Sequence, residues 1–265
     1  MSRLANFVSE TRHDGGVALL SFDNAARANS IDASIVGELH RKVQALIADP
    51  AVRAIVLTGK GKAFSTGADV KQFADGVKDG TAVQWVLDTT AELHPLLLEL
   101  RASDKVFIAA VNGVAAGGGL GLALAADARI GGPDARFAAG YFGLGLSPDG
   151  GSTWLLPRLM GEQRTRQFFF TNEVMTAETA FELGLLDEQV AVDQVVPRAL
   201  AVAAEWGAWA SRSREGTKRL LDAQSVLSFE QQLDLERGLI AAAAGTKDFK
   251  EGVAAFGEKR KPRFG

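Results

Sequence analysis

Three consecutive glycines in the middle of the chain are the first candidates for chemistry. Gly117, Gly118 and Gly119 follow an apolar run, Val106–Val111, and precede a helical segment of small residues, 120–126. A strand, a glycine turn and a helix start leave backbone N–H groups unpaired at the positive end of a helix dipole. Such a place binds anions. The pattern leaves open whether the anion is a phosphate, a carboxylate or an oxyanion that exists only during a reaction.

A second glycine loop repeats this arrangement earlier in the chain. Residues 59–69 lie between the apolar strand predicted for residues 54–57 and another helix. Because the two loops come from equivalent points in successive units, we expect them to lie side by side.

Asp149 is the acidic candidate for proton transfer. It stands in the run Ser147-Pro148-Asp149-Gly150-Gly151. A turn and helix N-cap explain this pattern equally well, because Pro-Asp-Gly is typical of both. His94 lies beside Pro95 in a predicted helix and can equally be a half-buried helix residue. The acids and histidines lack metal-ligand spacing, so we expect no metal site.

The elements that must position these residues form an α/β pattern. We expect a hairpin over residues 7–22, a helix over 35–47, a helix over 85–101 perturbed by Pro95, and a helix over 152–160. Helical periodicity dominates after about residue 165. The sequence therefore predicts an α/β core of repeated ββα or βαβ units, residues 1–200, and a helical C-terminal region, residues 201–265.

Composition excludes several classes of protein. The chain has 265 residues, a net charge of −3 and no cysteine. Disulfides, thiolate nucleophiles and Cys-ligated zinc are therefore excluded. Without basic patches we expect no nucleic-acid partner, and without a long apolar run we expect no membrane span or signal peptide. We expect a soluble, cytoplasmic, globular protein.

Together, the two loops resemble the crotonase superfamily, also called the enoyl-CoA hydratase/isomerase family. The resemblance rests on residues 63–69, AFSTGAD, and residues 111–119, VNGVAAGGG. Residues 24–30 and 256–262 add to it, so that it covers nearly the whole chain. Either loop alone would be a weak signal, because glycine loops before helices also serve nucleotides.

This resemblance implies a fold, a ligand and an assembly. The fold would be a crotonase-like spiral of ββα units with a helical C-terminal trimerisation region, in a homotrimer or a dimer of trimers. The ligand would be an acyl-CoA thioester, with coenzyme A as part of the substrate and no separate cofactor. The N–H groups of Ala68 and Gly118 would form an oxyanion hole for the thioester oxygen. Close packing of helix on sheet is the alternative explanation of the glycines.

The same resemblance points to residues that would hold coenzyme A. Ala26, Ala28 and Ala68 fall where backbone groups of the family meet the adenine and pantetheine. Phe256 and Lys259 match positions of the C-terminal helix that reach coenzyme A, often in a neighbouring subunit. Lys259 is explained equally well as a solvated charge at a helix end. Trp85, Phe142 and Leu144 are candidates for the acyl pocket or for the core.

Within the family, the acidic residues decide the chemistry. Hydratases use two glutamates, and this chain has Gly121 and Tyr141 in their places. Isomerases place one acid at Asp149. Residues 148–158, PDGGSTWLLPR, look like ring-1,2-epoxyphenylacetyl-CoA isomerases. One carboxylate suffices for a 1,3-proton shift through an enolate. The resemblance therefore implies an acyl-CoA isomerase with Asp149 as acid and base.

Two alternatives stay open. Aryl-CoA dehalogenases of the family use an acid at Asp149 as nucleophile and a histidine near His94 as base. These dehalogenases hold the acid with a Trp where this chain has Tyr141, and they have an Asn where it has Pro148. Tyr141 is a possible catalytic residue in this chain. A non-catalytic acyl-CoA-binding protein is the other alternative, because both glutamates are absent.

Overall fold

Two β-sheets form the centre of the molecule in the computed structural model, which describes residues 7–265. Residues 1–6, which the predicted core includes, lie outside the described part. The larger sheet has the strand order β1-β2-β3-β5-β7-β10, and the smaller has the order β4-β6-β8-β9. The strands of the larger sheet are β1 (Val8–His13), β2 (Val17–Phe22), β3 (Ala54–Gly59), β5 (Val106–Val111), β7 (Ala128–Gly131) and β10 (Glu188–Gln189). Those of the smaller sheet are β4 (Ala63–Ser65), β6 (Val114–Ala116), β8 (Arg136–Ala138) and β9 (Val174–Thr176).

The larger sheet is parallel apart from the β1–β2 hairpin, and helices cover both of its faces. Strands β3 and β5 are buried along their whole length, as expected for parallel strands with two covered faces. The helix α8 (Val195–Gly207) packs on one face. On the other lie α1 (Ala33–Ala48), α3 (Ala82–Ala102) and α4 (Gly118–Leu124). The core therefore lies in two layers around this sheet.

Successive units of one long strand, one short strand and one helix build the fold. β3 and β4 lead to α2 (Val70–Asp79), and β5 and β6 lead to α4. This confirms the predicted spiral of ββα units. Pro95 lies inside α3, which continues unbroken through it. The helix α5 (Ser152–Met160) matches its prediction, whereas α6 (Glu162–Phe170) was not predicted, because its apolar residues cluster at its end.

After α7 (Ala177–Glu182) and α8, three helices leave the core: α9 (Ser211–Ala223), α10 (Phe229–Ala244) and α11 (Lys247–Gly257). The predicted boundary at residue 200 falls inside α8, whose Ala199 and Val202 both pack against the sheet. The division into two regions at this residue stays a prediction, and the helices that leave the core begin with α9. The sequence could not show that α8 packs on the sheet, because the helical periodicity of its apolar residues is the same whether the helix faces a sheet or another helix.

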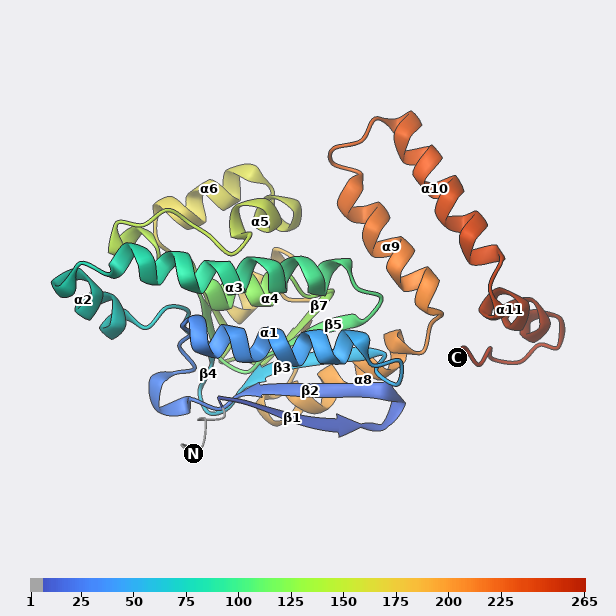
Figure 1. The fold of residues 1–265 in the computed structure, drawn as a ribbon, viewed down its shortest axis with the longest axis horizontal. Coiled ribbons are helices and arrows are strands. Elements are labelled where there is room, and N and C mark those ends of the chain that lie inside the picture. Colours follow the sequence, from blue (N-terminus) through green and yellow to red (C-terminus); the bar gives the residue numbers. More distant parts are fainter. Residues whose placement is uncertain (1–6) are drawn as a thin grey trace.

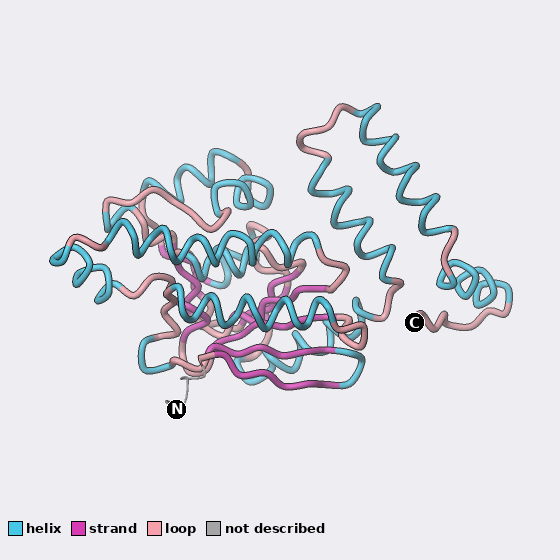
Figure 2. Tube along the Cα trace, in the orientation of Figure 1, coloured by secondary structure: helices cyan, strands magenta, loops and turns pink. Residues whose placement is uncertain are grey.

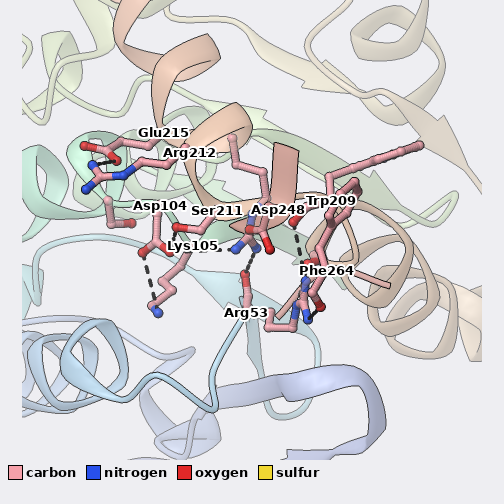
Figure 3. A network of polar contacts seen from close by, with 12 residues as sticks. Arg53, Asp104, Lys105, Trp209, Ser211, Arg212, Glu215, Asp248 and Phe264 are labelled. Carbon is pink, nitrogen blue, oxygen red and sulfur yellow. Dashed lines mark hydrogen bonds and ion pairs between the residues drawn. The ribbon is translucent and has the colours of Figure 1, made fainter. Parts of the chain in front are cut away.

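Arg53, just before β3, contacts both the end of α8 and residue Phe264 in the C-terminal tail (Figure 3). Its guanidinium donates to the carbonyl oxygens of Gly207 at 2.7 Å, Ala208 at 3.2 Å and Phe264 at 2.9 Å. Nearby, Ser211 Oγ donates to Asp104 at 2.8 Å. One charged side chain of the core therefore links the C-terminal tail to the end of α8.

Candidate active site

Parallel pairing of β4 with β6 brings the two glycine loops side by side. Ser65 at the end of β4 pairs with Ala115 of β6. The loops then touch so closely that a Cβ atom on Gly67 would lie 2.6 Å from the Ala116 oxygen and 3.1 Å from the Gly118 nitrogen. Gly67 has a φ of +75°, which favours glycine. The predicted juxtaposition of the loops is therefore confirmed.

The N–H groups of Ala68 and Gly118 have no hydrogen-bond acceptor in the described part of the chain. The β-bridge between Ile31 and Ala68 uses the Gly67 oxygen, which accepts from Ile31 N at 2.8 Å. Gly118 is the first residue of α4, where the N–H has no intrahelical partner. Both residues line one cavity of about 480 Å³. Two unpaired donors in one cavity can stabilise an oxyanion.

Buried and half-buried polar side chains that the sequence did not single out hold the first loop. Asn29 Nδ2 donates to the Ala63 oxygen at 2.7 Å, and Ser65 Oγ donates to the Asn29 oxygen at 2.8 Å. Asn112 Oδ1 accepts from Gly59 N at 3.1 Å. Asn29 has a φ of +54°, which asparagine tolerates better than most residues. The available signals were an asparagine in the loop before α1, Asn29, and an asparagine directly after β5, Asn112.

Gly119 shows that the packing explanation of the glycines also holds. A Cβ atom at this position would lie 2.3 Å from the Ser65 oxygen. Gly119 therefore lets the start of α4 approach β4, while Gly118 presents its N–H. The packing explanation therefore holds at Gly119, and the role of Gly118 in an oxyanion hole stays a prediction.

Asp149 lines the same cavity, and Tyr141 holds it there. The Tyr141 hydroxyl donates to Asp149 Oδ1 at 2.7 Å, whereas Oδ2 has no hydrogen-bond partner among residues 7–265. Tyr141 is only 7% exposed. Burial, followed by the negative charge of Asp149, raises the pKa of the Tyr141 hydroxyl, so that it stays a donor at neutral pH. The geometry leaves one oriented carboxylate oxygen free for proton transfer.

The turn that carries Asp149 is hydrogen-bonded through its backbone to Ser152, the first residue of α5. The Asp149 carbonyl oxygen accepts from Ser152 N at 3.1 Å and from Ser152 Oγ at 2.8 Å. The side chain does not cap α5. The turn part of the structural explanation is thus confirmed and the N-cap part is wrong, because the carboxylate is directed to Tyr141 instead.

The structure has no room for a side chain at Gly121. A Cβ atom there would lie 2.4 Å from the Gly150 oxygen and 3.0 Å from Gly150 Cα. The backbone beside Asp149 thus occupies the space that a longer residue 121 would need. A second carboxylate at this position is sterically excluded, and Tyr141 provides a phenol at the other expected position.

Apolar side chains form most of the cavity wall. Besides the loops, the lining residues include Phe73, Trp85, Val86, Leu93, Leu144 and Leu146. Trp85 and Leu144 thus lie where an acyl pocket was expected, whereas Phe142 packs against Phe169 and Phe170 instead. Phe73 was missed, because the sequence does not show which face of α2 meets the cavity.

Several expected site residues lie outside the cavity. His94 is exposed on α3, one residue after Leu93, which lines the wall. This does not place a histidine base beside Asp149, as a dehalogenase would need, because successive helix residues point in different directions. Phe256 is 88% exposed in α11, which lies across the molecule from α2 (Figure 1). Lys259, just after α11, is also exposed, and neither residue lines the cavity that contains Asp149. Their contacts with coenzyme A, in this or a neighbouring subunit, stay a prediction.

The candidate coenzyme A contacts of the N-terminal loop, Ala26 and Ala28, are not among the residues that line the cavity. Ala26 is exposed, and Ala28 has a φ of +49°. The Ala28 oxygen accepts from Thr66 N at 3.2 Å, so the loop packs directly beside the Ala68 loop. Their contacts with coenzyme A stay a prediction.

Comparison with known proteins identifies the family. The family model described as enoyl-CoA hydratase/isomerase matches residues 12–265. This chain belongs to the enoyl-CoA hydratase/isomerase family. A Rhodobacter capsulatus member named "Probable enoyl-CoA hydratase" is 36% identical over 249 residues, which cover 94% of each chain. An Escherichia coli member named 1,2-epoxyphenylacetyl-CoA isomerase is 33% identical over 251 residues, covering 94% of this chain and 95% of the other.

Solved structures of family members share the whole fold. An enoyl-CoA hydratase from Polaromonas sp. JS666 superimposes with a TM-score of 0.91 at 29% identity, covering 97% of this chain and 99% of the other. Most of the similar family members carry the name hydratase. The family and fold are thus established, while the names alone favour hydration over isomerisation. Among the described residues, no helix has the length and apolar character needed to cross a bilayer.

Proposed function

We propose that this family member is an acyl-CoA isomerase that works through a thioester enolate, with Asp149 as its acid and base. The observation that carries the proposal is the oriented Asp149 carboxylate in the same cavity as the unpaired N–H groups of Ala68 and Gly118. The lack of space at Gly121 supports isomerisation over two-carboxylate hydration, although most relatives are named hydratases.

The proposed proton shift needs only these groups. Asp149 takes the C2 proton of a 3-enoyl thioester, and the C–H electron pair moves into the C1–C2 bond. The thioester oxygen becomes an oxyanion, which Ala68 and Gly118 stabilise by about 3–4 kcal/mol per donor. Asp149 then returns the proton at C4, and the product is the 2-enoyl thioester. No cofactor besides the coenzyme A of the substrate takes part.

The same enolate site suits the rearrangement named for the Escherichia coli relative. Removal of the C2 proton from an acyl group that carries a ring epoxide would again place negative charge on the thioester oxygen. We therefore propose isomerisation as the reaction class and include both a double-bond shift and a ring-epoxide rearrangement. A homotrimer or a dimer of trimers stays a prediction.

Deuterium incorporation tests the proposal. Incubation of a 3-enoyl-CoA in deuterated water should give a 2-enoyl-CoA that carries deuterium at C2 or C4. Asp149→Asn should slow this exchange by about 10²–10⁴-fold, since it removes the acid–base group. Asp193→Asn, an exposed acid outside the cavity, is the matched control and should exchange like the wild type.

Three other results would contradict the proposal. Water addition to a 2-enoyl-CoA that persists in Asp149→Asn would identify a hydratase. Halide release from a 4-halobenzoyl-CoA that is lost in His94→Gln would identify a dehalogenase. Tight binding of acyl-CoA without exchange in the wild type would identify a binding protein.

A further inference from the structure

Two aromatic side chains form one wall of the cavity. Phe73 of α2 and Trp85 of α3 lie with ring centroids 4.5 Å apart and ring planes at 59°. Both are partly buried, and both line the cavity that contains Asp149. Aromatic surfaces of this kind favour a planar ring over a flexible chain of similar size, because ring–ring contacts add to the area buried.

A series of hydrogen bonds fixes the indole of Trp85. Its Nε1 donates to Gln72 Oε1 at 2.7 Å, and Gln72 Nε2 donates to Asp32 Oδ2 at 3.0 Å. Asp32 Oδ1 in turn accepts from Ile35 N at 3.0 Å and so caps α1, which packs in the core. The ring of Trp85 is thus oriented by the folded core and does not need a ligand to order it.

Charge restricts the acyl group further. Within residues 7–265, no Lys, Arg or His lines this cavity, and Asp149 is the one charged lining residue. A carboxylate at the far end of an acyl chain would meet mostly apolar walls, a negative charge and neutral hydroxyls such as the unpaired Oγ1 of Thr89, but no cation. Burying it there without a cationic partner is unfavourable.

We infer that Trp85, oriented by Gln72 and Asp32, is a specificity-determining residue that selects a neutral, ring-bearing acyl group. Straight-chain acyl groups bind less tightly, and acyl groups that end in a carboxylate bind least. The inference rests on the proposed function, because it takes the cavity to hold the acyl group of a CoA thioester. To the proposed reaction, the inference adds the chemical class of the acyl group that the cavity accepts.

Calorimetric binding of three saturated thioesters tests the inference. The probes are phenylacetyl-CoA, hexanoyl-CoA and the mono-CoA thioester of adipic acid. The wild type should bind phenylacetyl-CoA about three- to tenfold more tightly than hexanoyl-CoA. It should bind the adipoyl thioester at least about tenfold more weakly than hexanoyl-CoA.

Variants separate the roles of the two side chains. Trp85→Leu should abolish the preference for the ring while leaving hexanoyl-CoA binding within about threefold. Gln72→Leu keeps the indole but frees it, so it should reduce the preference without abolishing it. Trp206→Leu, on α8 and outside this cavity, is the matched control and should keep the wild-type preference. Trp85→Phe, a milder change, should keep part of the preference if Trp85→Leu fails to fold.

The binding test and the deuterium-exchange test can each fail without the other. Equal affinities for phenylacetyl-CoA and hexanoyl-CoA in the wild type would overturn the inference, as would a preference unchanged in both Trp85→Leu and Trp85→Phe. None of the three probes needs to react, so a ring preference without deuterium exchange would refute the proposed function alone. Exchange without a ring preference would refute this inference alone.

Discussion

Replacement of Gly121 by alanine tests the close packing that sets the chemistry of the site. The added methyl carbon would lie 2.4 Å from the Gly150 oxygen. This is about 1 Å shorter than an ordinary van der Waals contact. Both atoms belong to backbone-anchored elements, so the turn after Asp149 must move by a similar distance. Overpacking of this kind costs about 1–3 kcal/mol of folding stability.

The same displacement should reduce catalysis more than stability. A misplacement of about 1 Å can cost on the order of 10²-fold in rate. We therefore expect Gly121→Ala to slow deuterium exchange about 100-fold, whereas the affinity for a saturated acyl-CoA changes little because Ala68 and Gly118 stay in place. Urea denaturation and exchange in deuterated water measure the two effects. Gly238→Ala, in the open on α10, is the control and should not lose stability.

The reasoning would be refuted if Gly121→Ala kept wild-type stability and exchange, because the turn would then be free to yield. Gly121→Glu gives a second test. It should not gain water addition to a 2-enoyl-CoA, because the Gly150 backbone occupies the space of its side chain. A gain of hydratase activity in this variant would show that the position is merely vacant.

Three further predictions concern other contacts. Tyr141→Phe removes the 2.7 Å hydrogen bond to Asp149. Loss of a hydrogen bond to a charged group costs about 1.5–3 kcal/mol, so deuterium exchange should slow about 10–100-fold while the acyl-CoA affinity stays within about threefold. An affinity loss with an unchanged exchange rate would contradict this positioning role. Arg53→Met should increase hydrogen exchange in α9 and the C-terminal tail while the larger sheet stays protected. Equal exchange in variant and wild type would show that the four carbonyl contacts of Arg53 are dispensable. Hydrogen bonds from Arg260 lower the pKa of Glu251 to about 2, so this carboxylate stabilises the tail above its ordinary pKa of 4.5 and loses that effect as the pH falls toward 2. Pepsin cleavage of the tail should therefore rise over this pH range in the wild type but not in Glu251→Gln, and identical pH profiles would refute the assignment.

Much of the fold could be predicted because it depends on local patterns. The apolar run of β5, the periodicity of α1 and the hairpin of β1 and β2 are each encoded by residues that lie close together in the sequence. The three-residue strands of the smaller sheet were not predicted individually. They are too short to show a period, and their pairing partners lie far away in the sequence.

By itself, the sequence determined the two glycine loops, the presence of Asp149 and the absence of acids at Gly121 and Tyr141. These are facts of residue type, and they suffice to define the family and to predict the donors of an oxyanion hole. Tertiary structure alone decided which side chains share a cavity. It directed Tyr141 to Asp149, pressed Gly150 against Gly121 and left His94 on the outside of α3. Such contacts depend on how elements that are distant in the sequence pack together. On a helix, neighbouring residues such as Leu93 and His94 point in different directions, so only the packing decides which of them faces the site.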